Sequence, residues 1–182
     1  MDIKKESIDI INEIAFCMEK IDTARLNLLL EKIKQARRVF FVGTGRSRIM
    51  LSAFCMRLNH LGIESYIAGN IPCPPAEKGD LIIAASGSGE TPSVVAILKR
   101  LKKLDLDIFL FTASETIKEG DFASTVLKIN APSALINEQK NSKQLMRTLF
   151  EQTVFIIGET LIFCLTASMP EQEIVSRHTN LE

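Results

Sequence analysis

The sequence has few of the residues that bind metals and no excess of charge. It contains two histidines and four cysteines, and no two cysteines stand in the C-x-x-C spacing of a zinc site. Lysine plus arginine equals aspartate plus glutamate at 22 each, so the basic excess of nucleic-acid binders and polybasic membrane anchors is missing. The first residues, Met-Asp-Ile-Lys-Lys-Glu, do not resemble a signal peptide. These absences predict a cytoplasmic protein without a metal, and without nucleic acid or membrane as partners.

The sequence does contain enough apolar residues for one core. Hydrophobic residues make up 46% of the 182 residues, which argues against disorder and favours a single domain over residues 1–182. Residues 3–19 and 24–36 carry apolar side chains at helical spacing. We expect an N-terminal helical hairpin over residues 1–36, followed by an α/β core with C-terminal helices over residues 37–182.

From residue 39 onward, short apolar runs alternate with helical patterns. The predicted strands are 39–42, 64–68, 81–85, 107–111 and 125–129. Helices are expected between them, including a short one near 115–123. Continuous apolar runs are typical of strands that are buried on both faces. The pattern predicts a three-layer α/β fold: a five-stranded parallel sheet flanked by helices, in flavodoxin-like order, with a ligand crevice at the carboxyl ends of the strands.

A segment rich in hydroxyls and glycines, here called the hydroxyl loop, follows the strand 81–85. It reads Ser-Gly-Ser-Gly-Glu-Thr over residues 86–91. Pro92 then favours a helix start, which Thr91 is expected to cap. A helix N-terminus with the hydroxyls of Ser86, Ser88 and Thr91 predicts an anion site, most often for phosphate. The alternative is a turn of small residues without a ligand.

A second segment, here called the glycine loop, follows the strand 39–42 and reads Gly-Thr-Gly-Arg-Ser over residues 43–47. It is not a dinucleotide fingerprint, because Arg48 stands where the third glycine is required. In a parallel sheet both loops open at the same edge. Arg46 and Ser47 at the head of a helix suit a phosphate or a sugar hydroxyl. The alternative for Arg46 is a surface ion pair with a carboxylate.

Three residues are candidates for proton transfer. Glu151 stands at the edge of a long apolar helix expected over about 144–168, where a carboxylate can act as a general base. Periodicity alone favours an exposed helix residue instead. His60 and His178 can each serve as acid or base, although a lone histidine on a helix usually has a structural role. The apolar helix is interrupted by Glu159, so we expect core on one face and a subunit interface on the other, rather than a membrane span.

These motifs resemble the sugar isomerase (SIS) domain family. The two loops and their spacing carry the likeness to the superfamily. Over nearly the whole chain, the sequence resembles the 6-phospho-3-hexuloisomerases within it, notably in Leu-Phe-Glu-Gln (149–152) and in the final residues 177–182. The resemblance implies a homotetrameric enzyme that needs no cofactor. It would interconvert 3-hexulose 6-phosphate and fructose 6-phosphate, in formaldehyde fixation through the ribulose monophosphate pathway or in pentose supply.

The resemblance also implies residue roles. Glu151 matches the family's proposed base. The remaining matched positions bind the substrate: the phosphate is held by Ser86, Ser88 and Thr91, and the sugar site is lined by Gly43, Gly45, Arg46 and Ser47. The chain departs from the family pattern at Arg48, where a small residue is usual, and at Leu145 and Arg147, where proline and glycine are common.

The chemistry of the isomerisation limits which catalytic groups are needed and leaves other functions open. One carboxylate can move a proton between C2 and C3 through a cis-enediol, so Glu151 would suffice. Only the reverse reaction, from the cyclic fructose 6-phosphate, could use an acid for ring opening, which His60 or His178 could supply from the same or a neighbouring subunit. A non-catalytic phosphosugar-binding regulator, and an isomerase of another phosphosugar, both remain alternatives. A pure binder would not need Glu151.

Overall fold

The computed structural model describes residues 2–131, 142–167 and 169–178. Within these ranges the helices are α1 (Ile3–Glu19), α2 (Thr23–Gln35), α3 (Gly45–His60), α4 (Pro92–Lys102), α5 (Thr148–Thr166) and α6 (Glu171–Ser176). The strands are β1 (Val39–Val42), β2 (Ser65–Ile67), β3 (Leu81–Ala85), β4 (Asp107–Thr112) and β5 (Thr125–Lys128). All strand pairs are parallel and the order is β2-β1-β3-β4-β5, which confirms the predicted flavodoxin-like sheet.

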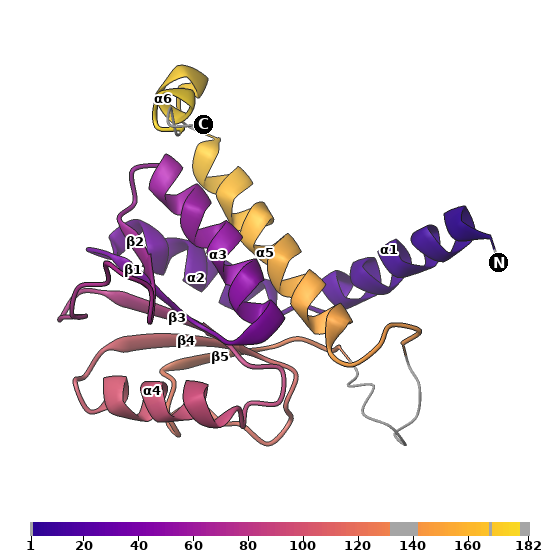
Figure 1. Cartoon of the computed structure of the whole chain (residues 1–182), viewed down its shortest axis with the longest axis horizontal. Coiled ribbons are helices and arrows are strands. Elements are labelled where there is room, and N and C mark those ends of the chain that lie inside the picture. The colour runs from indigo at the N-terminus through magenta and orange to yellow at the C-terminus, as the bar shows by residue number, and fades with distance from the viewer. Residues whose placement is uncertain (1, 132–141, 168, 179–182) are drawn as a thin grey trace.

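Helices cover both faces of this sheet and form the predicted three layers (Figure 1). α3 and α5 lie side by side over one face, and α4 covers the other. Successive strand residues point to opposite cores because side chains alternate along a strand. Phe41 and Ile83 face the core shared with α3 and α5, whereas Phe40 and Ile82 face the core shared with α4. Burial on both faces explains why β1 and β3 are continuous apolar runs.

The two N-terminal helices begin at capped positions close to those predicted. The carboxylate of Asp2 accepts a hydrogen bond from the Lys4 amide at 3.1 Å, and that of Asp22 accepts one from the Ala24 amide at 3.0 Å. The free end of α1 projects away from the body of the molecule (Figure 1). The helix exposes large apolar side chains along its length, namely Ile3, Ile8, Ile11 and Phe16.

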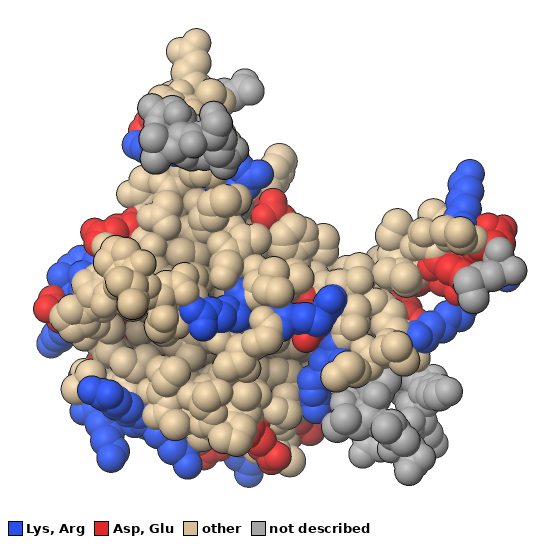
Figure 2. Space-filling model, viewed as in Figure 1, with Lys and Arg blue, Asp and Glu red and all other residues tan. Residues whose placement is uncertain are grey.

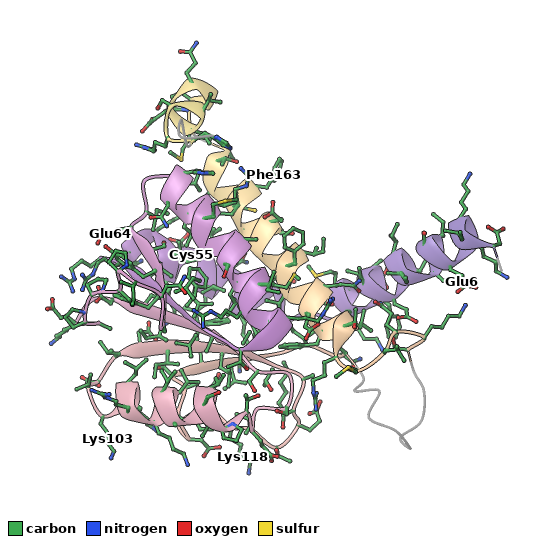
Figure 3. All side chains as sticks on the ribbon, in the orientation of Figure 1. Glu6, Cys55, Glu64, Lys103, Lys118 and Phe163 are labelled. Carbon is green, nitrogen blue, oxygen red and sulfur yellow. The ribbon has the colours of Figure 1, made fainter. Side chains whose placement is uncertain are left out.

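The apolar helix α5 packs closely against α3. A Cβ added to Gly158 would lie 3.2 Å from Cγ of Phe54, so this glycine is where the two helices approach. By length and composition, α5 is the one helix in the described ranges that could cross a membrane, and 44% of its apolar stretch is buried inside the protein. Phe155 remains exposed, and so does Phe163, which is labelled in Figure 3. One face of α5 therefore belongs to the core, as predicted.

Two elements differ from the sequence-based expectations. α5 begins at Thr148 rather than near 144, because the backbone of Met146 is left-handed (φ 56°) and interrupts the helix. The described residues 115–123 form turns instead of a short helix. There the Lys118 amide donates to Asp121 Oδ2 at 3.2 Å, and Gly120 is left-handed. Most of the loop expected over 130–143 lies outside the described residues.

Candidate functional site

The two predicted loops meet at one edge of the sheet. β1 and β3 are direct neighbours, with Val42 opposite Ala84, so the glycine loop and the hydroxyl loop leave the sheet side by side. α3 begins within the glycine loop at Gly45, and α4 begins directly after the hydroxyl loop at Pro92. Both helices therefore turn their positive N-terminal ends toward this edge. This arrangement favours an anion between the two loops.

The hydroxyls of the hydroxyl loop lie close together. Ser86 Oγ lies 2.9 Å from Thr91 Oγ1, and Ser88 Oγ lies 3.5 Å from the same atom. Thr91 is the N-cap residue of α4, as predicted, but its side chain does not make the expected capping hydrogen bond. Its hydroxyl lies with the two serines instead, and therefore does not occupy the first amides of α4. Hydroxyls and helix N-terminus together form a place suited to a phosphate.

Glycine is required at two positions around these loops. Gly89 is left-handed (φ 70°), and a Cβ there would lie 2.4 Å from Cγ1 of Ile117. At Gly43, where β1 turns into α3, a Cβ would lie 3.1 Å from Cδ1 of Leu51. Only glycine therefore lets the chain make both turns without moving buried neighbours.

Arg46 of the glycine loop and Glu151 of α5 form an ion pair at this edge. Arg46 Nε donates to Glu151 Oε2 at 2.5 Å. The side chain of Glu151 is 13% exposed and that of Arg46 is 55% exposed. Glu151 is therefore not the exposed helix residue that periodicity favoured, and the carboxylate partner considered for Arg46 is Glu151 itself. Ser47, next to Arg46, is buried in the first turn of α3.

Further arginines lie around the same edge. Arg48 donates to Oδ1 of Asn70, which follows β2. Arg147 directly precedes α5, and its Cδ would lie 2.6 Å from a Cβ on Gly87 of the hydroxyl loop. In Figure 2, lysine and arginine side chains form a blue band where α3 and α5 begin in Figure 1. The edge that carries the two loops is thus the start of three helices and is rich in positive charge.

The segment before α5 is held by a residue that sequence reasoning missed, Glu13 of α1. Its carboxylate accepts hydrogen bonds from the Ser142 hydroxyl at 2.7 Å, the Lys143 amide at 2.8 Å and the Gln144 side chain at 3.1 Å. Burial raises the pKa of Glu13, but these donors outweigh it and leave the pKa below its ordinary value. No sequence motif marks Glu13, because its partners are about 130 positions away in the chain.

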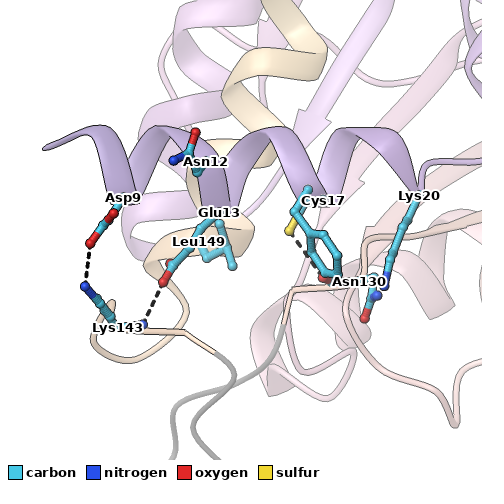
Figure 4. A pocket seen from close by; sticks show the side chains of 9 residues that line it. Asp9, Asn12, Glu13, Cys17, Lys20, Asn130, Lys143 and Leu149 are labelled. Atoms are coloured by element: carbon cyan, nitrogen blue, oxygen red, sulfur yellow. Dashed lines mark hydrogen bonds and ion pairs between the residues drawn. The ribbon is translucent and has the colours of Figure 1, made fainter. Parts of the chain in front are cut away.

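A pocket of about 650 Å³ opens along this side of α1 (Figure 4). Asp9, Glu13 and Lys143 lie at one end of it, with Lys143 Nζ 2.5 Å from Asp9 Oδ2. At the other end, Cys17 Sγ donates to the Asn130 carbonyl at 3.2 Å. These contacts tie α1 to both ends of the segment that leads from β5 to α5. The pocket is therefore adjacent to the approach to Glu151, not to the two loops.

The two histidines lie together at the opposite end of the α3–α5 pair. His60 is the last residue of α3, and its ring centroid lies 5.2 Å from that of His178. A rise of 1.5 Å per residue puts His60 about 22 Å from the start of α3, where Arg46 and Glu151 meet. Burial, the positive charge of Arg57 and the nearby His178 lower the pKa of His60. Within one chain, neither histidine is near the loops.

The described residues include no group of three or more His, Cys, Asp or Glu side chains placed to hold a metal. All four cysteines are free, and Cys17 and Cys55 are buried. Burial and the neighbouring Cys73 raise the pKa of Cys55 to about 11. Cys17 and Cys55 are therefore packing residues in this structure.

Comparison with known proteins places these features in a family. The model of the SIS domain matches residues 32–157, which include both loops and Glu151. The chain is 34% identical to the 3-hexulose-6-phosphate isomerase of Mycobacterium gastri over 173 residues, which is 94% of this chain and 87% of that protein. It is 34% identical to the 3-hexulose-6-phosphate isomerase of Methanocaldococcus jannaschii over 186 aligned residues, which cover 98% of each protein.

A solved structure shows the same arrangement. It is a hypothetical protein from Methanococcus jannaschii, for which a function of 3-hexulose-6-phosphate isomerase was inferred. It matches this chain with a TM-score of 0.82 and 30% sequence identity, over 98% of this chain and 99% of that one. The two proteins therefore share one fold over nearly their whole length.

Proposed function

The chain belongs to the SIS domain family as a phosphosugar isomerase, and we propose that it interconverts 3-hexulose 6-phosphate and fructose 6-phosphate. The relatives that bear the name of this activity align over nearly the whole chain at 34% identity. The observation that carries the proposal is the Arg46–Glu151 ion pair beside the hydroxyl loop. It supplies a carboxylate and a cation next to a phosphate-type site, which are the groups that a ketose isomerisation needs.

In this proposal the hydroxyl loop anchors the substrate. The phosphate binds to Ser86, Ser88, Thr91 and the first amides of α4. Gly43, Gly45, Arg46 and Ser47 line the sugar. The phosphate is remote from the reacting carbons, so its binding energy can hold C2 and C3 in register with the base.

Glu151 then moves the proton. Its carboxylate takes the proton from C2 of 3-hexulose 6-phosphate, and the electrons of that bond form the C2–C3 double bond of an enediolate. Arg46 lies within hydrogen-bond distance of Glu151 and can stabilise the developing negative charge on the sugar oxygens. The protonated Glu151 returns the proton to C3, while the hydroxyl proton on O2 passes to O3. The product is the 2-ketose, and the carboxylate is restored.

The test is solvent exchange at the sugar carbons. Wild type, Glu151→Gln and Glu159→Gln are incubated with each sugar phosphate in deuterated water, and NMR follows deuterium at C2 and C3. Glu159 lies on the same helix two turns from Glu151, so it is the matched control. We expect exchange in wild type and in Glu159→Gln, and none in Glu151→Gln. Binding without exchange in wild type would contradict isomerisation of these substrates.

The reverse reaction starts from cyclic fructose 6-phosphate and could use an acid to open the sugar ring. His60 and His178 are candidates, but their place at the far end of α3 means that a neighbouring subunit would have to supply them. We therefore propose that this role depends on a homo-oligomer, a tetramer by resemblance. The exposed apolar side chains of α1 and α5 support such an assembly. A single domain over residues 1–182, a cytoplasmic location and a role in formaldehyde fixation or pentose supply belong to the same proposal.

A non-catalytic phosphosugar-binding regulator is the competing function. Such a protein would use the hydroxyl loop but would have no need of Glu151. The nearly buried, paired Glu151 favours the enzyme. Organic cofactors and metals have no part in the proposed chemistry, because the proton shuttles between one carboxylate and two adjacent carbons.

A further inference from the structure

Arg147 reaches the hydroxyl loop from the start of α5. A Cβ on Gly87 would lie 2.6 Å from Cδ of Arg147 and 3.5 Å from its Nε. Gly87 stands between Ser86 and Ser88, so the guanidinium end of Arg147 lies at the loop whose hydroxyls and following amides suit an anion. The missing side chain at position 87 is what allows this approach.

Arg147 brings a positive charge to the hydroxyl loop, which contains no lysine or arginine of its own. A phosphate monoester carries nearly two negative charges at neutral pH, whereas hydroxyls and amides are neutral. The planar guanidinium of arginine matches two phosphate oxygens at once. Arg147 therefore lies where it can neutralise a phosphate on the hydroxyl loop.

Arg147 also connects this loop to Glu151. The Glu151 amide donates to the Arg147 carbonyl at 3.1 Å, which is a backbone hydrogen bond of the first turn of α5. Arg147 and Glu151 are thus one helical turn apart on the same rigid element. A phosphate held by Arg147 fixes the start of this helix, and with it the position of the carboxylate.

We propose that Arg147 binds the phosphate group of the substrate, and that this contact couples phosphate binding to the placement of Glu151. The coupling rests on the proposed isomerase function. The phosphate contact itself requires only a phosphorylated ligand, so the two parts can fail separately.

Inorganic phosphate is the probe for the contact, because it binds without turnover. Calorimetry compares wild type with Arg147→Met, which keeps a long side chain but removes the charge. Arg100→Met is the matched control, since Arg100 is an exposed arginine in the last turn of α4. Loss of a charged hydrogen-bond partner should weaken phosphate binding about 10- to 100-fold in Arg147→Met. The control should bind like wild type. Equal affinity in Arg147→Met and wild type would overturn the proposal.

Steady-state kinetics with fructose 6-phosphate test the coupling. Arg147→Met should raise KM and also lower kcat, and Arg147→Lys should fall between it and wild type because lysine keeps the charge without the fork. Millimolar guanidinium chloride should restore part of the activity of Arg147→Ala. A residue that only shapes the loop would not be rescued, and a raised KM with unchanged kcat would refute the coupling.

A measurement on the wild type keeps the proposal testable even if the Arg147 variants do not fold. Phenylglyoxal labels arginines, and peptide mapping resolves the rate at each one. Phosphate should slow the labelling of Arg147 several-fold and leave that of Arg100 unchanged. Equal labelling of Arg147 with and without phosphate would refute the contact, whether or not the protein isomerises a sugar.

Discussion

The α3–α5 pair carries charged and titratable groups at both ends, and the two ends differ in what surrounds them. At the site end, Arg46 and Glu151 meet beside the hydroxyl loop. At the histidine end, His60 and His178 lie together with Arg57 nearby, 3.5 Å from His60 Nδ1. Both clusters lie at the ends of the same two packed helices. The packing of the helices therefore does not tell which cluster is the functional site and which is structural.

The direction of the helices explains the difference. Helix N-termini present free amides and a positive dipole end, and parallel strands place them at the carboxyl edge of the sheet. The histidine end is the C-terminal end of α3, where a cation such as Arg57 complements the negative dipole. A cation there stabilises a helix, whereas a carboxylate at the site end, paired with a cation beside a phosphate-type loop, is available for chemistry.

The largest expected effect is a difference in catalysis between substitutions at the site end and at the histidine end. Glu151→Gln should lower kcat about 10²- to 10⁴-fold, because the amide cannot accept the proton. His60→Ala and His178→Ala should each lower kcat far less in the direction from 3-hexulose 6-phosphate. Initial rates in both directions are the measurement. If a histidine opens the sugar ring from a neighbouring subunit, its variant should be impaired only from fructose 6-phosphate, and equal losses in both directions would reject that role.

Two glycines with left-handed backbone, one at each end, allow the stability cost of an added side chain to be compared between the ends. Gly89 at the site end and Gly62 at the histidine end have φ of 70° and 79°. Gly89→Ala should cost about 2–5 kcal/mol, because the left-handed backbone and a clash with buried Ile117 add up. Gly62→Ala should cost about 1–2 kcal/mol, since its new Cβ meets only the end of the flexible Arg177 side chain. Urea unfolding measures both, and equal losses would argue against a rigid site end.

The hydrogen bonds that Glu13 accepts from residues 142–144, here called the Glu13 clamp, give a smaller effect that depends on pH. Glu13→Gln should lower stability by about 1 kcal/mol, because the weaker acceptor still bonds some of its partners. The folded pKa of Glu13 lies below its ordinary value of 4.5, so its stabilisation is present above 4.5 and is lost as pH falls through the folded pKa. Wild type should therefore lose stability more steeply than Glu13→Gln below about pH 4.5. If the free energy of unfolding falls equally steeply with pH in both proteins, the Glu13 clamp is contradicted.

The smallest effect concerns His60 and protonation. Its pKa in the folded protein lies below the ordinary value of 6.5, so the unfolded chain binds the proton more readily. The contribution to stability is present above 6.5 and is lost as pH falls through the folded pKa. The free energy of unfolding should decline less between about pH 7 and about pH 5 in His60→Ala than in wild type. An unchanged pH slope in the variant would show that His60 is not coupled to folding.

Local patterns in the sequence were sufficient for much of the fold. The continuous apolar runs of β1 and β3, the loops that follow them and the helical spacing of α1 and α2 all depend on neighbours within a few residues. The alternation of strands and helices then leaves few right-handed arrangements, and the flavodoxin-like order is one of them. The short helix expected near 115–123 failed because side-chain bonds in the turn, such as Asp121 to the Lys118 amide, compete with helix formation.

Tertiary structure alone decided which groups meet. The sequence by itself determined that residues 86–91 form a loop of hydroxyls and glycines at a helix start, and that Glu151 stands at the edge of an apolar helix. Only the packed fold brings Arg46 to Glu151 across 105 positions, sets Arg147 against Gly87, and leaves His60 at the far end of α3. The physical reason is that periodicity and turn chemistry act within a few residues, whereas these contacts arise when α5 packs against α3 and the sheet edge.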